Sequence, residues 1–134
     1  MKAHLTRRYW FAASHRLHTD KLSEAENRAI YGKCNNPFGH GHNYALEVTV
    51  SGQVAPDTGM VYNLPDLDLL VRNEVLERFD HQNLNCIPEF QEIVPTTENL
   101  CTAIFNILKR KLDAVHLERV RLEETSQNSF EVLG

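Results

Sequence analysis

The sequence has few cysteines, no long apolar run and no excess of positive charge, and each of these absences excludes a class of protein. Its three cysteines, Cys34, Cys86 and Cys101, form an odd set without a short repeated spacing, which does not suit a disulfide framework and indicates a reducing cytoplasm. No stretch approaches the roughly twenty apolar residues of a membrane span, and no apolar segment follows the basic N-terminus, so we expect neither a membrane anchor nor a secretory signal. The net charge of −4 argues against a nucleic-acid partner, whose phosphates require a basic face.

The rest of the composition is that of an ordinary globular protein. A length of 134 residues predicts a single domain, residues 1–134, that buries an apolar core without needing a disulfide. The small acidic excess still permits a small phosphorylated substrate, because such a ligand requires only a few local cations. Histidine is the unusual component: seven histidines occur in the chain, and they are unevenly spread.

Alternating side chains predict two long strands in the first half of the chain. The segment from Leu5 to His15 alternates and is rich in aromatic residues, and the segment from His40 to Val54 alternates cleanly. Between them, Ser23 and Glu26 have the spacing of a capping box, which predicts a short helical turn from Ser23 to Ile30. If the two strands pair, the end of the first lies beside the start of the second.

The second half predicts two helices followed by two strands. Apolar stripes run from Leu64 towards Phe79 and from Thr97 to Leu112, and Leu117–Val132 has the pattern of two short strands around a turn. The order ββααββ predicts an α+β fold, a four-stranded antiparallel sheet with two helices on one face. We expect the other face to be apolar and covered by a second subunit.

Three histidines have the pattern of a catalytic zinc site. His40 and His42 alternate on one strand, so their rings project to the same side, and Gly41 leaves the opposite side open. His15 ends the neighbouring predicted strand. Three neutral imidazoles with an open fourth position are typical of catalytic rather than structural zinc. Any one of these histidines taken alone is equally well explained as a packed or surface residue.

Cys34 lies in a loop just before this pair of histidines, directly after Lys33. A neighbouring ammonium group and a nearby metal both lower the pKa of a thiol and favour the thiolate. The residues leave two interpretations open. Cys34 either completes and closes the zinc site as a fourth ligand, or stands beside it as a base or nucleophile.

Two further positions carry ionisable side chains of interest. Asp80 and His81 follow the first long helix and suit an oriented acid–base pair, although histidine is also common at the C-terminal end of a helix for electrostatic reasons. Of Glu123 and Glu124, alternation turns one towards the packed face of the sheet, where a carboxylate requires a binding partner. Cys101 lies close to an apolar helix stripe and is expected to be a buried small residue.

Several segments resemble, in order, the motifs of 6-pyruvoyl tetrahydropterin synthases. The two longest are Phe11–Leu17 (FAASHRL) and Gly32–Tyr44 (GKCNNPFGHGHNY). Shorter matches are Asp57–Val61, Asp80–Leu84, Thr96–Asn99 and Glu124–Thr125. Together the segments span nearly the whole chain, and the long cysteine–histidine motif is highly specific.

The resemblance implies a fold, an assembly and a reaction. It implies a T-fold (tunnelling fold) subunit, with the same four-stranded sheet and two helices, in a homohexamer built as a dimer of trimers. The implied enzyme is a zinc-dependent lyase that converts the pterin 7,8-dihydroneopterin triphosphate to 6-pyruvoyl tetrahydropterin and releases triphosphate.

The resemblance also implies roles for individual residues. One zinc ion per subunit would be held by His15, His40 and His42; Cys34 would be the general base, with Asp80 and His81 as acid–base partners; Glu124 would hold the pterin ring, helped by the backbone of Thr96 and Thr97. On charge alone, Lys33 and Arg16 are candidates for the triphosphate.

Three alternatives remain open. Relatives that act as 6-carboxytetrahydropterin synthases in queuosine and other deazapurine biosynthesis usually have three residues between the cysteine and the histidine pair, whereas five stand here, Asn35 to Gly39. Within that loop Phe38 occupies a position where a polar residue is more usual. The other two alternatives are a non-catalytic module with a closed Cys-His₃ zinc site and a simple zinc hydrolase.

Overall fold

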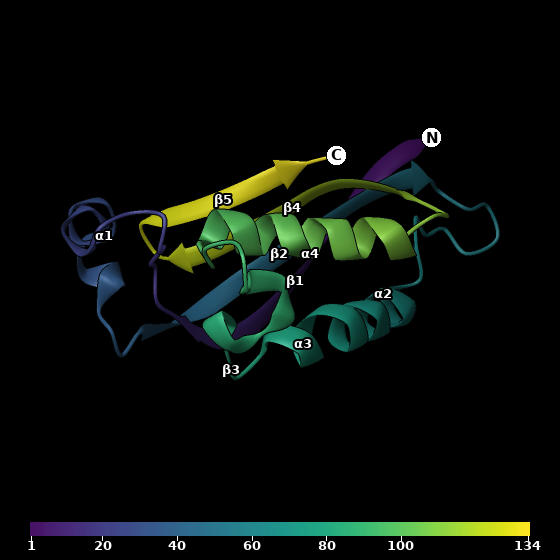
Figure 1. Ribbon diagram of the computed structural model, residues 1–134. Coiled ribbons are helices and arrows are strands. Elements are labelled where there is room, and N and C mark those ends of the chain that lie inside the picture. The colour runs from purple at the N-terminus through teal and green to yellow at the C-terminus, as the bar shows by residue number, and fades with distance from the viewer.

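The computed structural model describes residues 1–134 and has an α+β fold, with helices lying against one face of a single sheet (Figure 1). The strands, in the spatial order β3-β1-β2-β4-β5, are β1 Lys2–His15, β2 His40–Gln53, β3 Gln82–Asn83, β4 His116–Thr125 and β5 Asn128–Leu133. The helices are α1 Glu24–Tyr31, α2 Leu64–Val71, α3 Glu77–Phe79 and α4 Thr97–Lys111, with 3₁₀ turns at Gly32–Asn35, Leu84–Cys86 and Pro88–Phe90. None of the helices combines the length and the apolar character that crossing a membrane requires.

The two long strands pair along their whole length. β1 and β2 are antiparallel, with Leu5 opposite Val50 and His15 opposite His40. Because residues that face each other across an antiparallel pair point to the same side, the alternating side chains of the two strands form one continuous face. The predicted pairing of these strands is confirmed, and it places His15 beside the start of β2.

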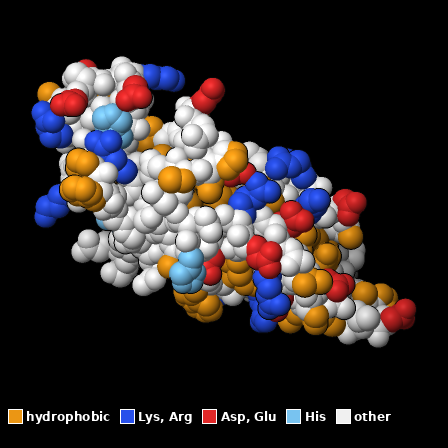
Figure 2. Space-filling model, turned by 60° about the horizontal axis from the view of Figure 1, so that its bottom comes forward, with side chains coloured by type: hydrophobic (Ala, Val, Ile, Leu, Met, Phe, Trp, Pro, Cys, Tyr) orange, Lys and Arg blue, Asp and Glu red, His pale blue; other side chains and the backbone are white.

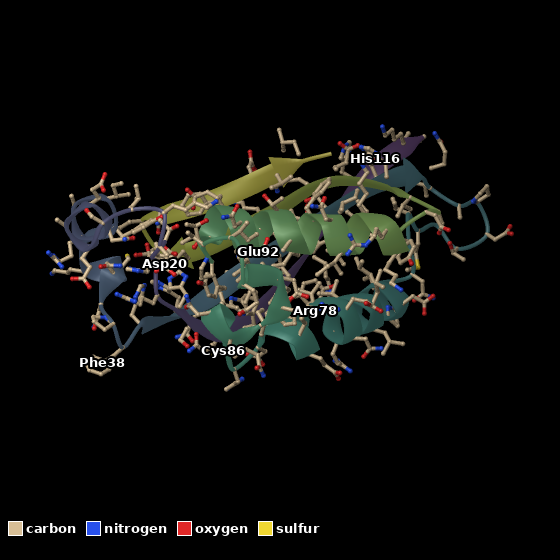
Figure 3. The ribbon with its side chains drawn as sticks, viewed as in Figure 1. Asp20, Phe38, Arg78, Cys86, Glu92 and His116 are labelled. Atoms are coloured by element: carbon tan, nitrogen blue, oxygen red, sulfur yellow. The ribbon has the colours of Figure 1, made fainter.

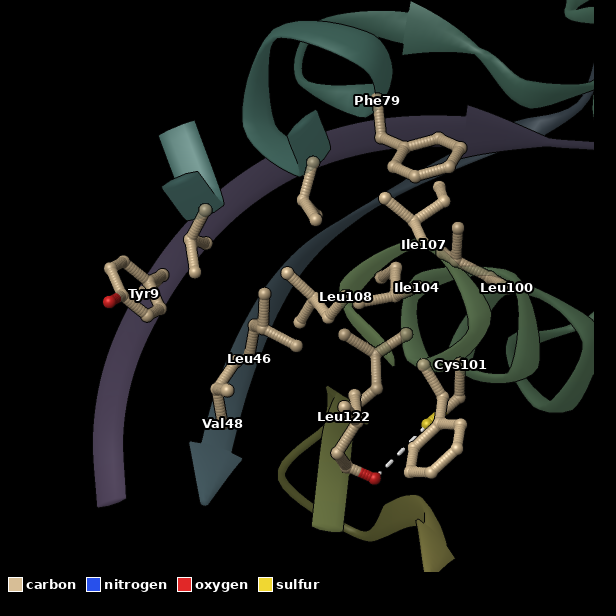
Figure 4. Packing of buried hydrophobic residues seen from close by; sticks show 14 of the residues in the cluster. Tyr9, Leu46, Val48, Phe79, Leu100, Cys101, Ile104, Ile107, Leu108 and Leu122 are labelled. Carbon is tan, nitrogen blue, oxygen red and sulfur yellow. Dashed lines mark hydrogen bonds between the residues drawn. The ribbon is translucent and has the colours of Figure 1, made fainter. Parts of the chain in front are cut away.

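The core lies between this face and the helices. Figure 4 shows Leu46 of β2, Leu108 of α4 and Leu122 of β4 converging there, and all three are completely buried. Burying a leucine side chain contributes about 1.5–3 kcal/mol to folding, so this layer supplies much of the stability. Cys101 is part of it: its thiol donates to the carbonyl of Val120 at 3.3 Å, and burial raises its pKa to about 12. The prediction of a buried small residue at this position is confirmed.

The helix expected from Leu64 to Phe79 is one continuous helical stretch, because a wider π turn at Arg72–Leu76 joins α2 to α3. Asn63 caps this stretch, since its side chain accepts from the backbone of Asp66 at 3.2 Å. The predicted capping box of Ser23 and Glu26 also forms. Local sequence signals therefore begin these helices where the periodicity predicts.

The expectation of a four-stranded sheet with two helices on one face is met only in part. The sheet has a fifth strand, β3, which runs parallel to β1 with Ala13 opposite Gln82. Two residues are too short for any alternation to reveal, and the pairing arises only because the chain leaving α3 passes the outer edge of β1. In addition, α1 is a third helical body, and it lies beyond the end of the sheet rather than on its face (Figure 1).

The expectation of an apolar open face is also wrong. On the side away from the helices, the carboxylate of Glu47 accepts hydrogen bonds from Arg8 at 2.8 Å and from Arg121 at 3.0 Å. Arg119 contacts the other oxygen of Glu47 at 3.4 Å, and Trp10, 66% exposed, is the large apolar side chain of this face. Alternation turned charged residues of neighbouring strands to one side, where they neutralise one another. In the single chain, backbone N–H and C=O groups stay unpaired along the outer edges of β1 and β5.

Candidate functional site

His15, His40 and His42 meet at the end of the sheet, on the face that the helices cover. Their ligand nitrogens all lie within 4.8 Å of one another, and the Nε2 atoms of His15 and His40 are 3.0 Å apart. The register explains the cluster, since His15 pairs with His40 and Ala13 pairs with His42. The predicted grouping of the three histidines is confirmed.

The close approach of the two strands at this point requires a glycine. Gly39, just before β2, has a φ of 72°, and a Cβ there would lie 3.1 Å from the carbonyl oxygen of His15. A side chain would thus both strain the backbone and press against β1. The neighbouring Phe38, by contrast, projects from the loop into solvent and is 96% exposed (Figure 3).

The surroundings of the cluster fit a metal ion. His15 is 1% exposed, and its Nδ1 lies 2.7 Å from the carbonyl oxygen of Pro95, which places a proton on Nδ1 and leaves Nε2 free as a ligand atom. His42 Nε2 is buried without any hydrogen-bond partner, and a buried polar atom of this kind requires one. Burial lowers the pKa of His15 and of His40, which favours the neutral imidazoles that metals bind.

Glu124 is the carboxylate of this site. Its Oε2 lies 3.8 Å from His42 Nε2 and 3.9 Å from His15 Nε2. The side chain is 16% exposed, against 41% for Glu123, so Glu124 is the one that faces the packed side. Burial opposes its ionisation, but hydrogen bonds from Thr97 and Asn128 and the nearby histidines bring its pKa below the usual value.

The two threonines at the start of α4 have different tasks. The Thr96 side chain caps the helix by accepting from the backbone of Asn99 at 3.1 Å. Thr97 is buried, and its hydroxyl donates to Glu124. The first turn of α4 therefore holds the carboxylate beside the histidines.

Cys34 lies in the Gly32–Asn35 turn, where its carbonyl accepts from the backbone of Leu17 at 2.9 Å. The thiol is half-buried and is not among the ligand atoms that group together, an arrangement that favours an open three-histidine site over a closed one. Burial and, after it, the charge of Glu124 raise the pKa of the thiol. The expected lowering by Lys33 is absent, because Lys33 lies exposed on the surface.

Asp80 and His81 do not join this cluster within one chain. Asp80 Oδ1 accepts from the backbone of Ala12 at 2.9 Å and lies 2.9 Å from His81 Nδ1; the Ala12 hydrogen bond and the His81 contact lower the pKa of Asp80. His81 has a φ of 59°, a strained value for a residue with a side chain. It borders a shallow hollow with Ala12 and Asn43, whose side chains alternate to the open face of the sheet, and His42 of the cluster lines the same hollow.

Arg16 and Lys33 line one pocket, as their assignment to a common ligand requires. The same pocket contains two basic residues that the sequence analysis did not single out, His18 and Arg28. The sequence patterns also did not indicate Tyr44 as a site residue. Its buried hydroxyl has no hydrogen-bond partner, and its pKa is raised by burial and by Glu124. It follows His42 by two residues on the same strand, so the alternation that grouped the histidines could have found it.

Comparison with known proteins gives consistent results. A family model described as 6-pyruvoyl tetrahydropterin synthase matches residues 4–134. The 6-pyruvoyl tetrahydrobiopterin synthase of Poecilia reticulata is 46% identical over 93% of this chain and 86% of its own, and that of Homo sapiens is 44% identical over 95% and 88%. The structure of Caenorhabditis elegans 6-pyruvoyl tetrahydropterin synthase superposes with a TM-score of 0.95 at 41% identity, over 100% of this chain and 96% of that one.

Proposed function

The chain belongs to the 6-pyruvoyl tetrahydropterin synthase family, and from this premise we propose that it is a zinc-dependent lyase that converts 7,8-dihydroneopterin triphosphate to 6-pyruvoyl tetrahydropterin and releases triphosphate. One observation carries the proposal. Three imidazoles converge on a buried face of the sheet with Glu124 less than 4 Å from two of them.

His15, His40 and His42 would hold the zinc ion, which when bound supplies Lewis-acid chemistry that acidifies the C–H bonds beside the hydroxyls of the substrate. The Pro95 carbonyl orients His15 for this task through Nδ1. An open fourth position suits a substrate with two adjacent hydroxyl groups, whereas a closed site would exclude it.

Glu124 anchors the pterin ring. An ionised carboxylate accepts hydrogen bonds only, and a pterin presents a ring N–H beside an exocyclic amino group, which together match its two oxygens. Thr97 and Asn128 already donate to this carboxylate and keep it ionised and oriented. The ring therefore docks at a fixed distance from the histidines.

Cys34 acts as the base that removes a proton from the side chain of the substrate. In the free chain, burial and the charge of Glu124 keep its thiol protonated. A pterin that donates two hydrogen bonds to Glu124 spreads the negative charge of the carboxylate, which removes one of these two causes. Substrate binding thus favours the thiolate at the moment when it is needed.

Asp80 and His81 complete the site from a neighbouring copy of the chain. Asp80 accepts a hydrogen bond from His81 Nδ1, so that Nε2 of the ring is left to exchange a proton with the substrate. We infer that this pair, which lies at the β3 edge and borders the open face, serves Cys34 of a neighbouring copy across an interface. We therefore infer the homohexamer, a dimer of trimers, in which the free edges of β1 and β5 pair between subunits. Three unpaired cysteines suit the cytoplasm as its compartment.

The test is the identity of the product. The purified protein, loaded with zinc, is incubated with 7,8-dihydroneopterin triphosphate, and the pterin and the released phosphate are identified by mass spectrometry. We expect 6-pyruvoyl tetrahydropterin and triphosphate. A 6-carboxypterin with acetaldehyde as the sole products would overturn the proposal in favour of a 6-carboxytetrahydropterin synthase.

A further inference from the structure

A pocket of about 500 Å³ lies at the end of the molecule formed by α1 and the Gly32–Asn35 turn, and no hydrophobic residue lines it. Arg16, Arg28 and Lys33 contribute three cations from three different segments of the chain, and His18 adds a fourth basic group. Figure 2 shows several Lys and Arg side chains at this end, where α1 lies, next to Asp and Glu side chains. In a protein of net charge −4, this concentration of positive charge is a local feature.

Two of the basic side chains are held by one buried residue, Asn35: Arg16 by its backbone carbonyl and His18 by its side-chain amide. Arg16 Nε donates to the carbonyl of Asn35 at 3.1 Å, and the Asn35 side chain contacts His18 Nδ1 at 3.0 Å. Asn35 itself is 7% exposed and donates to the carbonyl of Leu17 at 2.8 Å. The two terminal nitrogens of the Arg16 guanidinium have no partner within the chain, so this group is both fixed and free to bind.

The Lys and Arg side chains of the pocket are poorly compensated, whereas His18 Nε2 lies 3.3 Å from the carboxylate of Asp20. The one carboxylate in the lining belongs to Glu24, which is 4.0 Å from Arg28 on the next turn of α1 and is itself 90% exposed. Such an exposed pair is weak, and Glu24 is free to turn into solvent. Lys33 makes no ion pair. Cations that converge in this way repel one another, and an anion bound among them relieves the repulsion.

The pocket adjoins the histidine cluster. Arg16 directly follows the metal ligand His15, and Lys33 directly precedes Cys34. A smaller hollow of about 250 Å³ is lined by His15, Arg16 and Pro37, and it shares Arg16 and Pro37 with the cationic pocket. A ligand whose hydroxylated carbons lie at the histidines therefore places an anionic tail among the cations.

We propose that this pocket binds the polyphosphate tail of the substrate and that Arg28 is a specificity-determining residue, the third cation beside Arg16 and Lys33. The inference rests on the proposed function and adds to it a reason for selecting a triphosphate. Every phosphate of the tail is anionic at neutral pH, and arginine binds phosphate oxygens through paired N–H groups. A monophosphate engages fewer of these cations than a triphosphate does.

The test separates tail binding from turnover. Binding of inorganic tripolyphosphate to the zinc-loaded protein is measured by calorimetry at two salt concentrations, for the wild type and for Arg28→Gln. Arg110→Gln, an exposed arginine on α4, is the matched control. We expect Arg28→Gln to weaken tripolyphosphate binding about tenfold, Arg110→Gln to leave it unchanged, and high salt to weaken the wild type most.

Turnover supplies the second readout. Arg28→Gln should raise KM for 7,8-dihydroneopterin triphosphate with little change in kcat, and should leave binding of unphosphorylated dihydroneopterin unchanged. Equal tripolyphosphate affinity in Arg28→Gln and the wild type would overturn the pocket while leaving the proposed function intact. Tripolyphosphate binding that depends on Arg28, in a protein that does not form the pyruvoyl product, would overturn the proposed function and uphold the pocket.

Discussion

The hydroxyl of Thr97, the first residue of α4, donates a hydrogen bond to the carboxylate of Glu124 on β4. This contact ties the start of a helix to the middle of the site, because Glu124 lies beside two of the three clustered histidines. The position of the Glu124 carboxylate therefore depends on how α4 packs on the sheet.

Thr97→Val removes this donor and keeps the shape of the side chain. We expect KM for the pterin substrate to rise roughly ten- to a hundredfold, the value of one hydrogen bond to a charged group, with zinc content unchanged. Steady-state kinetics and metal analysis measure the two effects. Thr97→Ser retains the hydroxyl and should behave like the wild type; a similar loss in both variants would assign the effect to packing instead.

Cys34→Ala separates a base from a metal ligand. As a base, Cys34 is required for proton removal, and we expect turnover to fall by about two to four orders of magnitude while one zinc ion per subunit is retained. Metal analysis alongside product formation gives the answer. Cys86→Ala, at an exposed thiol, is the control and should keep full activity. Loss of zinc from Cys34→Ala would support the closed Cys-His₃ module.

Removal of the metal should destabilise the protein as well as inactivate it. A ligand that binds only the folded state stabilises it by mass action, and the buried His42 Nε2 otherwise lacks a partner. We expect a chelator to lower Tm by several degrees and added zinc to restore it. His42→Ala should abolish the zinc-dependent rise in differential scanning fluorimetry, whereas His116→Ala, remote from the cluster, should preserve it. An unchanged Tm on chelation would contradict the metal site.

The proposed sharing of the site between subunits predicts complementation. Cys34→Ala and His81→Ala are each expected to be inactive, but hexamers that contain both chains hold some sites in which intact Cys34 and intact His81 meet. Random mixing should restore about a quarter of the wild-type activity. Co-expression with two different tags, followed by tandem purification and assay, measures this. Persistent inactivity of the mixed hexamers would place both residues in one chain, and a monomer in sedimentation would refute the assembly.

Stability in acid should depend on Asp68. Arg7 and Tyr9 donate to its carboxylate at 2.9–3.0 Å and 2.8 Å, and the Arg7 hydrogen bond first, then that of Tyr9, lowers its pKa below the usual value of 3.8. A depressed folded-state pKa gives stability that is present above pH 3.8 and is lost as the pH falls further, towards the folded-state value.

Asp68→Asn tests this relationship by urea unfolding between pH 7 and pH 2.5. We expect the variant to be less stable than the wild type at neutral pH, and the difference in the free energy of unfolding to shrink as the pH falls below about 4. Asp113→Asn, at an exposed position without an ion pair, should leave the profile unchanged. A difference that stays constant with pH would mean that Asp68 acts through packing and not through its charge.

The local periodicity of apolar residues was sufficient to predict most of the strands and helices. Alternation located β1 and β2, helical periodicity located α2 with α3 and α4, and the predicted capping box at Ser23 forms. The histidine cluster followed from the same alternation, because one strand period places His40 and His42 on one side. Each of these features depends on residues a few positions apart, which is the range over which backbone geometry constrains side chains.

Other features depended on which segments meet. The charged residues of the open face form their network only once β1, β2 and β4 are aligned, so no single strand revealed it. Cys34 shows the same limit: Lys33 beside it in sequence suggested a lowered pKa, whereas burial and Glu124, ninety residues later in the chain, raise it. Distance in space, which the order of residues does not encode directly, decides electrostatics.

The sequence by itself determined the three-histidine cluster and the residue types around it, because strand alternation is a local property of the backbone. Only the tertiary structure decided that Glu124 rather than Glu123 faces the histidines, that Asp80 and His81 lie beside β3 at the edge of the sheet, and that Arg28 shares a pocket with Arg16. These outcomes follow from strand register and from the packing of α1 and α4, which bring together groups far apart in the chain.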